Sequence, residues 1–229
     1  MKILELCDYS SGVCGVWQRV KQDAELLSKK NEVRIFSSNS VKGSTNFAPL
    51  QNKIGRINIR RFPFKKLGGE SYLVWNFERE AIKYRPDIII AHSYRHPHTT
   101  KALKIAKKIG AKVFLVTHAP FVENNSTRTF IEKNIVKFYD KFIRPKTINK
   151  FDKVIAITKW EIPYLLTIGC KKENIVYLPN GIPDSFFVKK TKKGKGVLFL
   201  GRISPVKNLE VVLEAIKNTN QKLTIIGPE

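Results

Sequence analysis

Short apolar runs alternate with amphipathic stretches over the first 180 residues. The runs are rich in β-branched residues and predict strands at 2–6, 32–36, 57–61, 87–91, 112–116, 153–157 and 175–178. Helical periodicity between them predicts helices at 16–28, 70–84, 99–109, 130–148 and 159–167. Thr158 followed by Glu161 is typical of a capping box at the start of the last helix. Strands and helices that alternate in this way predict an α/β, Rossmann-like domain with a parallel sheet covered on both faces.

The pattern changes after Leu178. Proline and glycine interrupt the chain between Pro179 and Pro183, and residues 189–196 are all Lys, Thr or Gly. A strand, helix, strand unit follows, with strands expected at 197–200 and 222–226 and a helix at 207–217. One such unit cannot bury its own faces. We therefore expect an acceptor-side domain over residues 1–185, a linker over 186–196 and the truncated start of a second Rossmann-like domain over 197–229.

The charge of the chain narrows the choice of partner. The 229 residues include 42 Lys plus Arg against 19 Asp plus Glu, which gives a formal net charge of +23. An excess of this size creates a long-range positive potential and predicts an anionic partner. Nucleic acid, an acidic membrane surface and phosphate-bearing small molecules all satisfy that condition. Composition does not choose among the three.

The cysteines and the N-terminal residues indicate the compartment. Cys7, Cys14 and Cys170 are odd in number and form no C-x-x-C pair, so neither a disulfide framework nor a zinc site is expected. Apolar and acidic residues alternate at the N-terminus, unlike the continuous apolar region of a signal peptide, and no later run is long enough to span a membrane. We expect a cytoplasmic protein that is at most peripheral on the inner membrane face.

A glycine-containing loop joins the first predicted strand to the first helix. Residues 10–15 include Gly12 and Gly15, and the loop could aim backbone N–H groups at a phosphate. A fold of this kind also needs a glycine turn at this point, so the structural reading stays open. The chain contains no Asp-x-Asp pair, and a metal-bound diphosphate would therefore lack its carboxylate ligands. If phosphate is bound, we expect cations to hold it.

Two histidines follow predicted strands. His92 and His118 each come just past the carboxyl end of a strand, at the edge where open α/β sheets build their sites. Both could reach a common cleft, although a structural role stays open for each. His96 and His98 read as loop residues.

Two blocks in the second half of the chain carry a family resemblance. The first is Asp152–Thr158 (DKVIAIT), continued by Leu178–Ile182 (LPNGI), and the second is Phe199–Asn208 (FLGRISPVKN). They resemble the large retaining glycosyltransferase family that contains bacterial mannosyltransferases, sucrose-phosphate synthases and glycogen synthase relatives. The resemblance implies a two-domain GT-B architecture and a nucleotide-diphosphate sugar as donor, with transfer that retains configuration and uses no metal or other cofactor. It also implies a lipid-linked or glycan acceptor.

The resemblance assigns roles to individual residues. Arg202 and Lys207 match the cations that hold the donor diphosphate, and His118 matches the histidine beside the transferring sugar. His92 is assigned to the acceptor side. Arg offers a fork of donors and Lys a compact charge, which suits the negative charge that a departing nucleotide diphosphate gathers. The family's acidic donor motif does not occur within residues 1–229, so we expect the isolated chain to be inactive.

One basic stretch of the first domain predicts a membrane-binding surface. Cations and aromatic residues interleave there, a mixture that suits lipid headgroups. The predicted surface consists of Arg60, Arg61, Phe62, Phe64, Lys65 and Lys66.

Three other functions compete with glycosyl transfer. They are a basic nucleic-acid-binding module, a membrane-binding module and a nucleotide-sugar epimerase of the same fold. The positive charge is dispersed and no known nucleic-acid-binding motif is visible, so we expect no nucleic-acid partner. The short loop 201–207 favours transfer over epimerisation.

Overall fold

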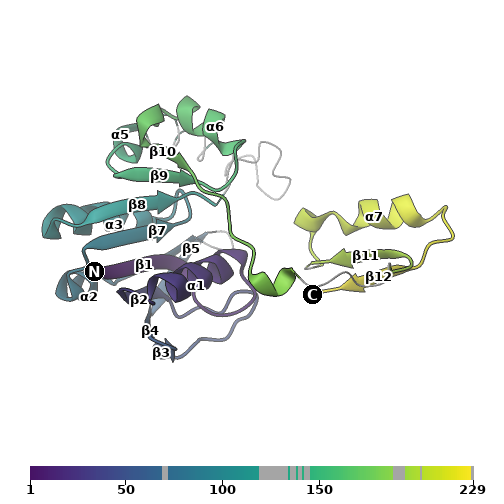
Figure 1. Ribbon diagram of the computed structural model, residues 1–229, viewed down its shortest axis with the longest axis horizontal. Coiled ribbons are helices and arrows are strands. Elements are labelled where there is room, and N and C mark those ends of the chain that lie inside the picture. The colour runs from purple at the N-terminus through teal and green to yellow at the C-terminus, as the bar shows by residue number, and fades with distance from the viewer. Residues whose placement is uncertain are drawn as a thin grey trace. The chain divides into compact units, whose positions relative to one another are not determined.

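The computed structural model describes residues 1–68, 72–118, 134, 138, 141, 145–187, 194–201 and 203–227. The chain forms two compact units that part after Asn180 (Figure 1). The first contains a large sheet with helices on its faces, and the second contains two strands and a helix.

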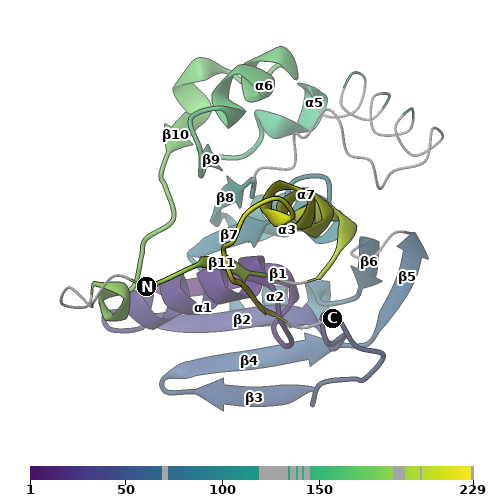
Figure 2. The same ribbon diagram turned by 90° about the vertical axis from the view of Figure 1, so that its right-hand side faces the viewer.

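An eight-stranded sheet organises the first unit. Its strands are β1 (Lys2–Tyr9), β2 (Glu32–Ser38), β3 (Gln51–Ile54), β4 (Ile57–Phe62), β7 (Ile88–His92), β8 (Lys112–Val116), β9 (Lys153–Ala156) and β10 (Ile175–Tyr177). Their order across the sheet is β10-β9-β8-β7-β1-β2-β4-β3. Neighbouring strands are parallel except β3, which pairs antiparallel with β4 at the edge (Figure 2). β1 therefore lies in the middle of the sheet, between β2 and β7.

Helices cover both faces of this sheet. They are α1 (Gly15–Leu27), α2 (Glu78–Tyr84), α3 (Pro97–Ile109), α5 (Pro145–Ile148) and α6 (Glu161–Thr167), with a 3₁₀ turn, η2 (Lys172–Asn174), before β10. α1 packs Trp17, Val20 and Ala24 over β1 and β2 (Figure 1). The opposite face of the sheet packs against α2, α3 and α6. Because successive side chains of a strand point to opposite faces, Ile3 belongs to the core under α1 and Leu4 to the other core.

Most predicted elements are present, and the α/β Rossmann-like class is confirmed. The helix expected at 70–84 is wrong in its first half, where β5 (Phe64–Gly68) and β6 (Tyr72–Trp75) form an antiparallel hairpin before α2. Leu73 and Trp75 are buried at a spacing of two, which is the strand period. The sequence pattern also did not predict β3. The helix expected at 130–148 lies largely outside the described residues, which include positions 134, 138 and 141 and α5 at its end.

The second unit contains β11 (Val197–Leu200), α7 (Leu209–Ile216) and β12 (Leu223–Ile226), with 3₁₀ turns η3 (Asp184–Phe186) and η4 (Pro205–Lys207). β11 and β12 are parallel neighbours, as expected for a strand, helix, strand unit. Leu209 is the α7 side chain that is buried.

Throughout the described ranges, no helix combines the length and the apolar character needed to cross a membrane. Cys7, Cys14 and Cys170, which all lie in described ranges, form no disulfide bond.

Candidate functional site

Polar side chains gather at the carboxyl ends of the central strands. The order of the parallel strands reverses at β1, because the chain builds outward from it first through β2 and β4 and then through β7, β8 and β9. Open α/β sheets bind ligands at such a switch point, outside the carboxyl ends of the strands. The candidate site therefore lies where β1, β7 and β8 end.

Glu5, His92 and His118 form a hydrogen-bonded chain at this edge. Glu5 Oε2 lies 2.6 Å from His92 Nε2, and His92 Nδ1 lies 2.9 Å from His118 Nε2. Glu5 and His92 are fully buried, whereas His118 is partly exposed. These three hydrogen-bonded side chains therefore run from the interior of the sheet to its surface.

Burial determines the protonation of Glu5, His92 and His118. It raises the pKa of Glu5 to about 8 and lowers the pKa of His92 to about 3. Burial, followed by the neighbouring His92, lowers the pKa of His118 to about 2. At pH 7 the predominant form is a neutral carboxyl beside two neutral imidazoles.

The neutral chain sets the tautomer of His118. The protonated Glu5 carboxyl donates to His92 Nε2, and the Nδ1–H of His92 then donates to His118 Nε2. The remaining proton of His118 lies on Nδ1, which has no hydrogen-bond partner in the part of the chain that the structure describes. His118 thus offers a hydrogen-bond donor at the edge of the sheet.

The turn that carries His118 is held by a buried carboxylate. His118 has φ 57°, a left-handed conformation that a non-glycine residue adopts only when its surroundings impose it. The hydroxyl of Thr117 donates to Glu161, which is fully buried. Glu161 also accepts from the backbone N–H groups of Ile157 (3.1 Å) and Thr158 (3.0 Å) and from the Thr158 hydroxyl (2.9 Å). Glu161 does accept from Thr158, but α6 has Trp160 at its N-cap position and no side-chain cap hydrogen bond, so the capping box expected to begin at Thr158 is not formed as predicted. The same carboxylate ties α6 to the turn after β8.

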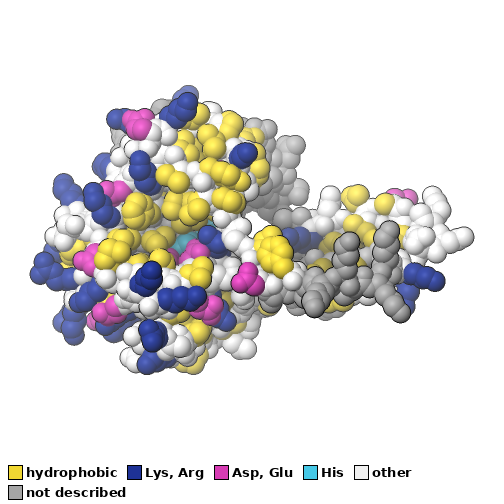
Figure 3. Space-filling model, in the orientation of Figure 1, with side chains coloured by type: hydrophobic (Ala, Val, Ile, Leu, Met, Phe, Trp, Pro, Cys, Tyr) yellow, Lys and Arg dark blue, Asp and Glu magenta, His cyan; other side chains and the backbone are white. Residues whose placement is uncertain are grey.

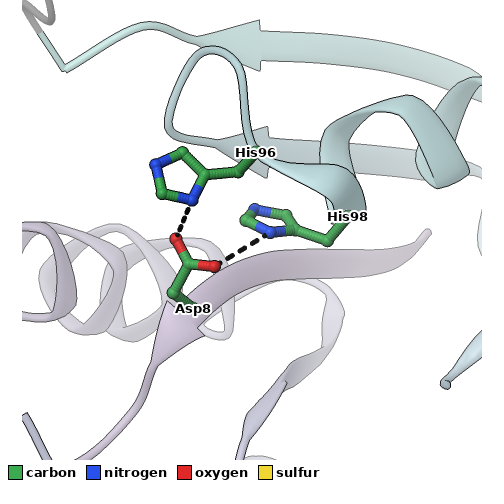
Figure 4. Close-up of side chains that lie close together, drawn as sticks. All are labelled: Asp8, His96 and His98. Atoms are coloured by element: carbon green, nitrogen blue, oxygen red, sulfur yellow. Dashed lines mark ion pairs between the residues drawn. The ribbon is translucent and has the colours of Figure 1, made fainter. Parts of the chain in front are cut away.

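A second polar cluster, Asp8, His96 and His98, lies at the same edge (Figure 4). Asp8 Oδ2 is 2.9 Å from His96 Nδ1, and Asp8 Oδ1 is 3.3 Å from His98 Nδ1. Burial alone would raise the pKa of Asp8, but His98 and His96 hold that pKa below its usual range. The sequence-based reading of both histidines as loop residues is wrong for His98, which is buried in the first turn of α3. His96 occupies the N-cap position of that helix and makes no side-chain cap hydrogen bond.

The glycine loop has a structural explanation at one of its two candidate positions. Gly12 has φ 84°, and a Cβ atom there would collide with the backbone oxygen of Lys42. Gly15 is the first residue of α1, is exposed, and has open space where a Cβ would point. Gly12 is thus required for the approach of two backbones, and phosphate binding by this loop stays a prediction.

Two members of the predicted membrane surface do not lie on it. Arg61 is 4% exposed, and its guanidinium donates to the hydroxyl (2.7 Å) and carbonyl (3.0 Å) of Ser10 and to the carbonyl of Pro49 (2.8 Å). Phe62 is buried and stacks on Trp75 with 5.8 Å between ring centroids. This correction has a local cause, because β4 ends with two consecutive buried side chains, on opposite faces of the sheet, and an interleaved sequence pattern does not reveal this.

The other members are accessible to different degrees. Lys65 and Lys66 on β5 are exposed, and Phe64 is half-buried against the core. Arg60 is exposed but pairs with Glu80 at 2.7 Å. Figure 3 shows Lys and Arg side chains scattered over the visible face of the first unit. The exposed basic site that remains is the pair Lys65 and Lys66.

The predicted diphosphate cations belong to the second unit. Lys207 ends η4 and is exposed, in the loop between β11 and α7. This loop follows the carboxyl end of a parallel strand, as the chain around His118 does in the first unit. Arg202 lies outside the described residues.

Sequence reasoning missed the acidic residues of β1. Glu5 and Asp8 interrupt an otherwise apolar strand, and we read them only as a departure from a signal peptide. A central parallel strand is normally apolar on both faces, so buried acids within it were the available signal. The sequence also placed His92 on the acceptor side; its side chain is fully buried and reaches the edge only through His118.

Comparisons with known proteins address the family and the fold. The profile of Glycosyltransferase Family 4 matches residues 14–186. The search of curated proteins finds no match.

Several solved structures share the fold. Anabaena HepE in complex with UDP and glucose is 13% identical with a TM-score of 0.65, over 98% of this chain and 60% of that one. An E. coli trehalose-6-phosphate protein bound with UDP-2-fluoro glucose is 14% identical with a TM-score of 0.58, over 98% and 64%. The apo lipopolysaccharide outer core galactosyltransferase WaaB is 17% identical with a TM-score of 0.53, over 98% and 60%. The chain thus spans about 60% of the length of HepE and has the GT-B fold that the sequence predicted.

Proposed function

The chain belongs to Glycosyltransferase Family 4, and from that premise we propose that the protein transfers a sugar from a nucleotide-diphosphate donor to an acceptor with retention of configuration. The observation that carries the proposal is the buried chain from Glu5 through His92 to His118 at the switch point of the sheet. It presents one oriented hydrogen-bond donor at the edge where α/β enzymes bind their substrates.

The proposed role of His118 is positioning. Its Nδ1–H can donate to a hydroxyl of the transferring sugar or of the acceptor and hold the reacting atoms in near-attack geometry. Its pKa of about 2 makes protonation at pH 7 negligible, so His118 is a poor general acid. Glu5 and His92 act through His118, because they fix its ring and its tautomer.

For the donor we propose a nucleotide-diphosphate sugar held by cations of the second unit. The structures of HepE with UDP and glucose and of the E. coli protein with UDP-2-fluoro glucose support this class of donor. Lys207 is exposed and lies in the loop that connects β11 to α7. Arg202 belongs to the same segment of the sequence. Their charges would stabilise the departing diphosphate without a metal ion bound to it.

The test of this function is transfer from nucleotide sugars. We expect the full-length protein to release nucleoside diphosphate from a UDP-sugar in the presence of acceptor, and NMR of the product to show the anomeric configuration of the donor. Replacing Lys207 with Ala should lower kcat/KM by about 100-fold or more, the range for loss of one donor to a developing anion. Lys217→Ala, a change of an exposed lysine in the same unit, is the matched control. Inversion would refute retention, and full activity of Lys207→Ala would refute the cation assignment.

We further propose a lipid-linked or glycan acceptor, met at the inner face of a membrane. The galactosyltransferase WaaB, named for the lipopolysaccharide outer core, supports an acceptor of this kind. The exposed pair Lys65 and Lys66 would contact anionic headgroups.

Vesicle binding tests the membrane contact. Each interfacial lysine is worth about 1 kcal/mol at low ionic strength, so Lys65→Gln with Lys66→Gln should weaken binding to anionic vesicles by roughly 30-fold. The control pair Lys29→Gln with Lys30→Gln, exposed beyond α1, should leave binding unchanged. Equal binding by both pairs would contradict the assignment, and equally tight binding to random DNA would favour a nucleic-acid partner instead.

A further inference from the structure

We propose that Asp8, His96 and His98 bind a divalent transition-metal ion, for which Zn²⁺ is the best match to the ligands. This site is distinct from the Glu5, His92, His118 chain and does not depend on the proposed transfer reaction. Sequence analysis predicted no metal, because neither an Asp-x-Asp pair nor a cysteine cluster is present. The three ligands come from the end of β1 and the start of α3 and meet only in the folded chain.

The three side chains converge on a small volume. One ligand atom from each lies within 4.8 Å of the others, and Figure 4 shows both rings turned toward the carboxylate. Ligand atoms about 2.0–2.2 Å from a tetrahedral zinc ion lie on the order of 3.3 Å apart. The separations of 2.9 Å and 3.3 Å from Asp8 to His96 and His98 are close to that value.

Three buried atoms of the cluster lack an aligned hydrogen bond. They are Asp8 Oδ1, His96 Nδ1 and His98 Nδ1, for which no aligned partner lies among the residues that the structure describes. Asp8 and the two rings are close enough for ion pairs, at 2.9 Å and 3.3 Å. A cation between the ring nitrogens and the carboxylate would be bound by all three side chains.

A hydrogen bond on its far side orients His98. Its Nε2–H donates to the backbone carbonyl of His92 at 2.7 Å. The other ring nitrogen, Nδ1, faces Asp8 Oδ1 at 3.3 Å and is the atom that a metal ion would bind. A second-shell hydrogen bond from the far ring nitrogen to a backbone carbonyl is also the usual support of a metal-binding histidine.

The loop before α3 is shaped to place these ligands. Ser93 and Arg95 have φ angles of 76° and 72°, in the left-handed region that non-glycine residues rarely adopt. The loop places His96 and His98 next to Asp8 at the carboxyl end of β1. The His96 side chain is 21% exposed, so the cluster lies near the surface. Two imidazoles with one carboxylate form a set of ligands that zinc and other first-row divalent ions accept.

Metal content and zinc binding test the site. The protein grown with added zinc should contain one metal ion per chain by mass spectrometry of the elements, and zinc added after chelation should raise its Tm. His96→Gln and Asp8→Asn should each weaken zinc binding by more than about 100-fold in calorimetry, because loss of even a ligand's hydrogen-bond partner costs 10–100-fold. Co²⁺ bound in place of zinc should give visible absorption bands that both variants lose.

His118→Gln is the matched control, a histidine at the same edge of the sheet but outside the cluster. It should keep the full metal content and zinc affinity. His96 is partly exposed, so His96→Gln should remain folded and keep the test decisive even if Asp8→Asn does not fold. Absence of bound metal in the wild type, no shift of Tm with zinc, or equal zinc affinity in His96→Gln would overturn the proposal. Because these measurements involve no sugar transfer, they stand apart from the test of the proposed function.

Discussion

Replacing His118 with Ala should lower turnover by roughly 100-fold or more while Tm stays nearly unchanged. The side chain is partly exposed, and one of its ring nitrogens has no partner in the described chain, so its loss removes little of the core. What it removes is the oriented donor that holds the reacting groups. Steady-state transfer kinetics and a thermal melt of the same preparation measure the two quantities.

Variants of Glu5 separate positioning from a merely structural role. Glu5→Gln keeps an N–H donor toward His92 Nε2, as the protonated carboxyl does, and should retain most of the activity. Glu5→Met removes that donor and should lower kcat more than it raises KM, because the tautomer of His118 is no longer fixed. Normal turnover of His118→Ala would defeat the assignment, and a large fall in its Tm would show that His118 is structural.

Replacing Glu161 with Ala should lower the free energy of unfolding by about 3 kcal/mol or more. The carboxylate accepts hydrogen bonds from Thr117, Thr158 and the backbone of Ile157, and all of these donors are left inside the protein when it is deleted. Each unsatisfied buried donor costs about 1–3 kcal/mol. Urea unfolding measures the change.

Two comparisons check the Glu161 prediction. Glu161→Gln keeps one carbonyl oxygen as an acceptor and should lie between the wild type and Glu161→Ala. Glu214→Ala removes an exposed carboxylate in the second unit and should change stability by less than about 0.5 kcal/mol. A loss below about 1 kcal/mol for Glu161→Ala would mean that water replaces the carboxylate, and the turn after β8 would then not depend on it.

The sequence predicted elements well where local pattern and burial agree. The parallel strands of the large sheet were found within a few residues, because their central members are apolar on both faces, whereas the antiparallel edge strand β3 was missed. Prediction failed at β6, where the spacing of Leu73 and Trp75 fits a strand but the surrounding residues resemble a helix. β6 is a strand because β5, which precedes it along the chain, pairs with it.

The positions of charged residues in the sequence predicted side-chain exposure poorly. Arg60 and Arg61 are neighbours in sequence, yet one is exposed and the other is buried against Ser10. The side chains of adjacent residues on a strand point to opposite faces, and only the neighbours on each face decide whether a guanidinium meets water or a protein oxygen.

By itself, the sequence determined the α/β class, the order of strands and helices, the family, and the place of His118 after a strand. Each of these follows from local periodicity or from a contiguous motif. The tertiary structure alone decided which polar groups meet. It joined Glu5 to His92 across 87 positions and set Asp8 against His96 and His98, because a parallel sheet brings the carboxyl ends of distant strands to one edge. Burial at that edge then raised the pKa of Glu5, and it left Asp8 Oδ1, His96 Nδ1 and His98 Nδ1 without an aligned hydrogen bond among the described residues. Neither property can be predicted from a local stretch of sequence.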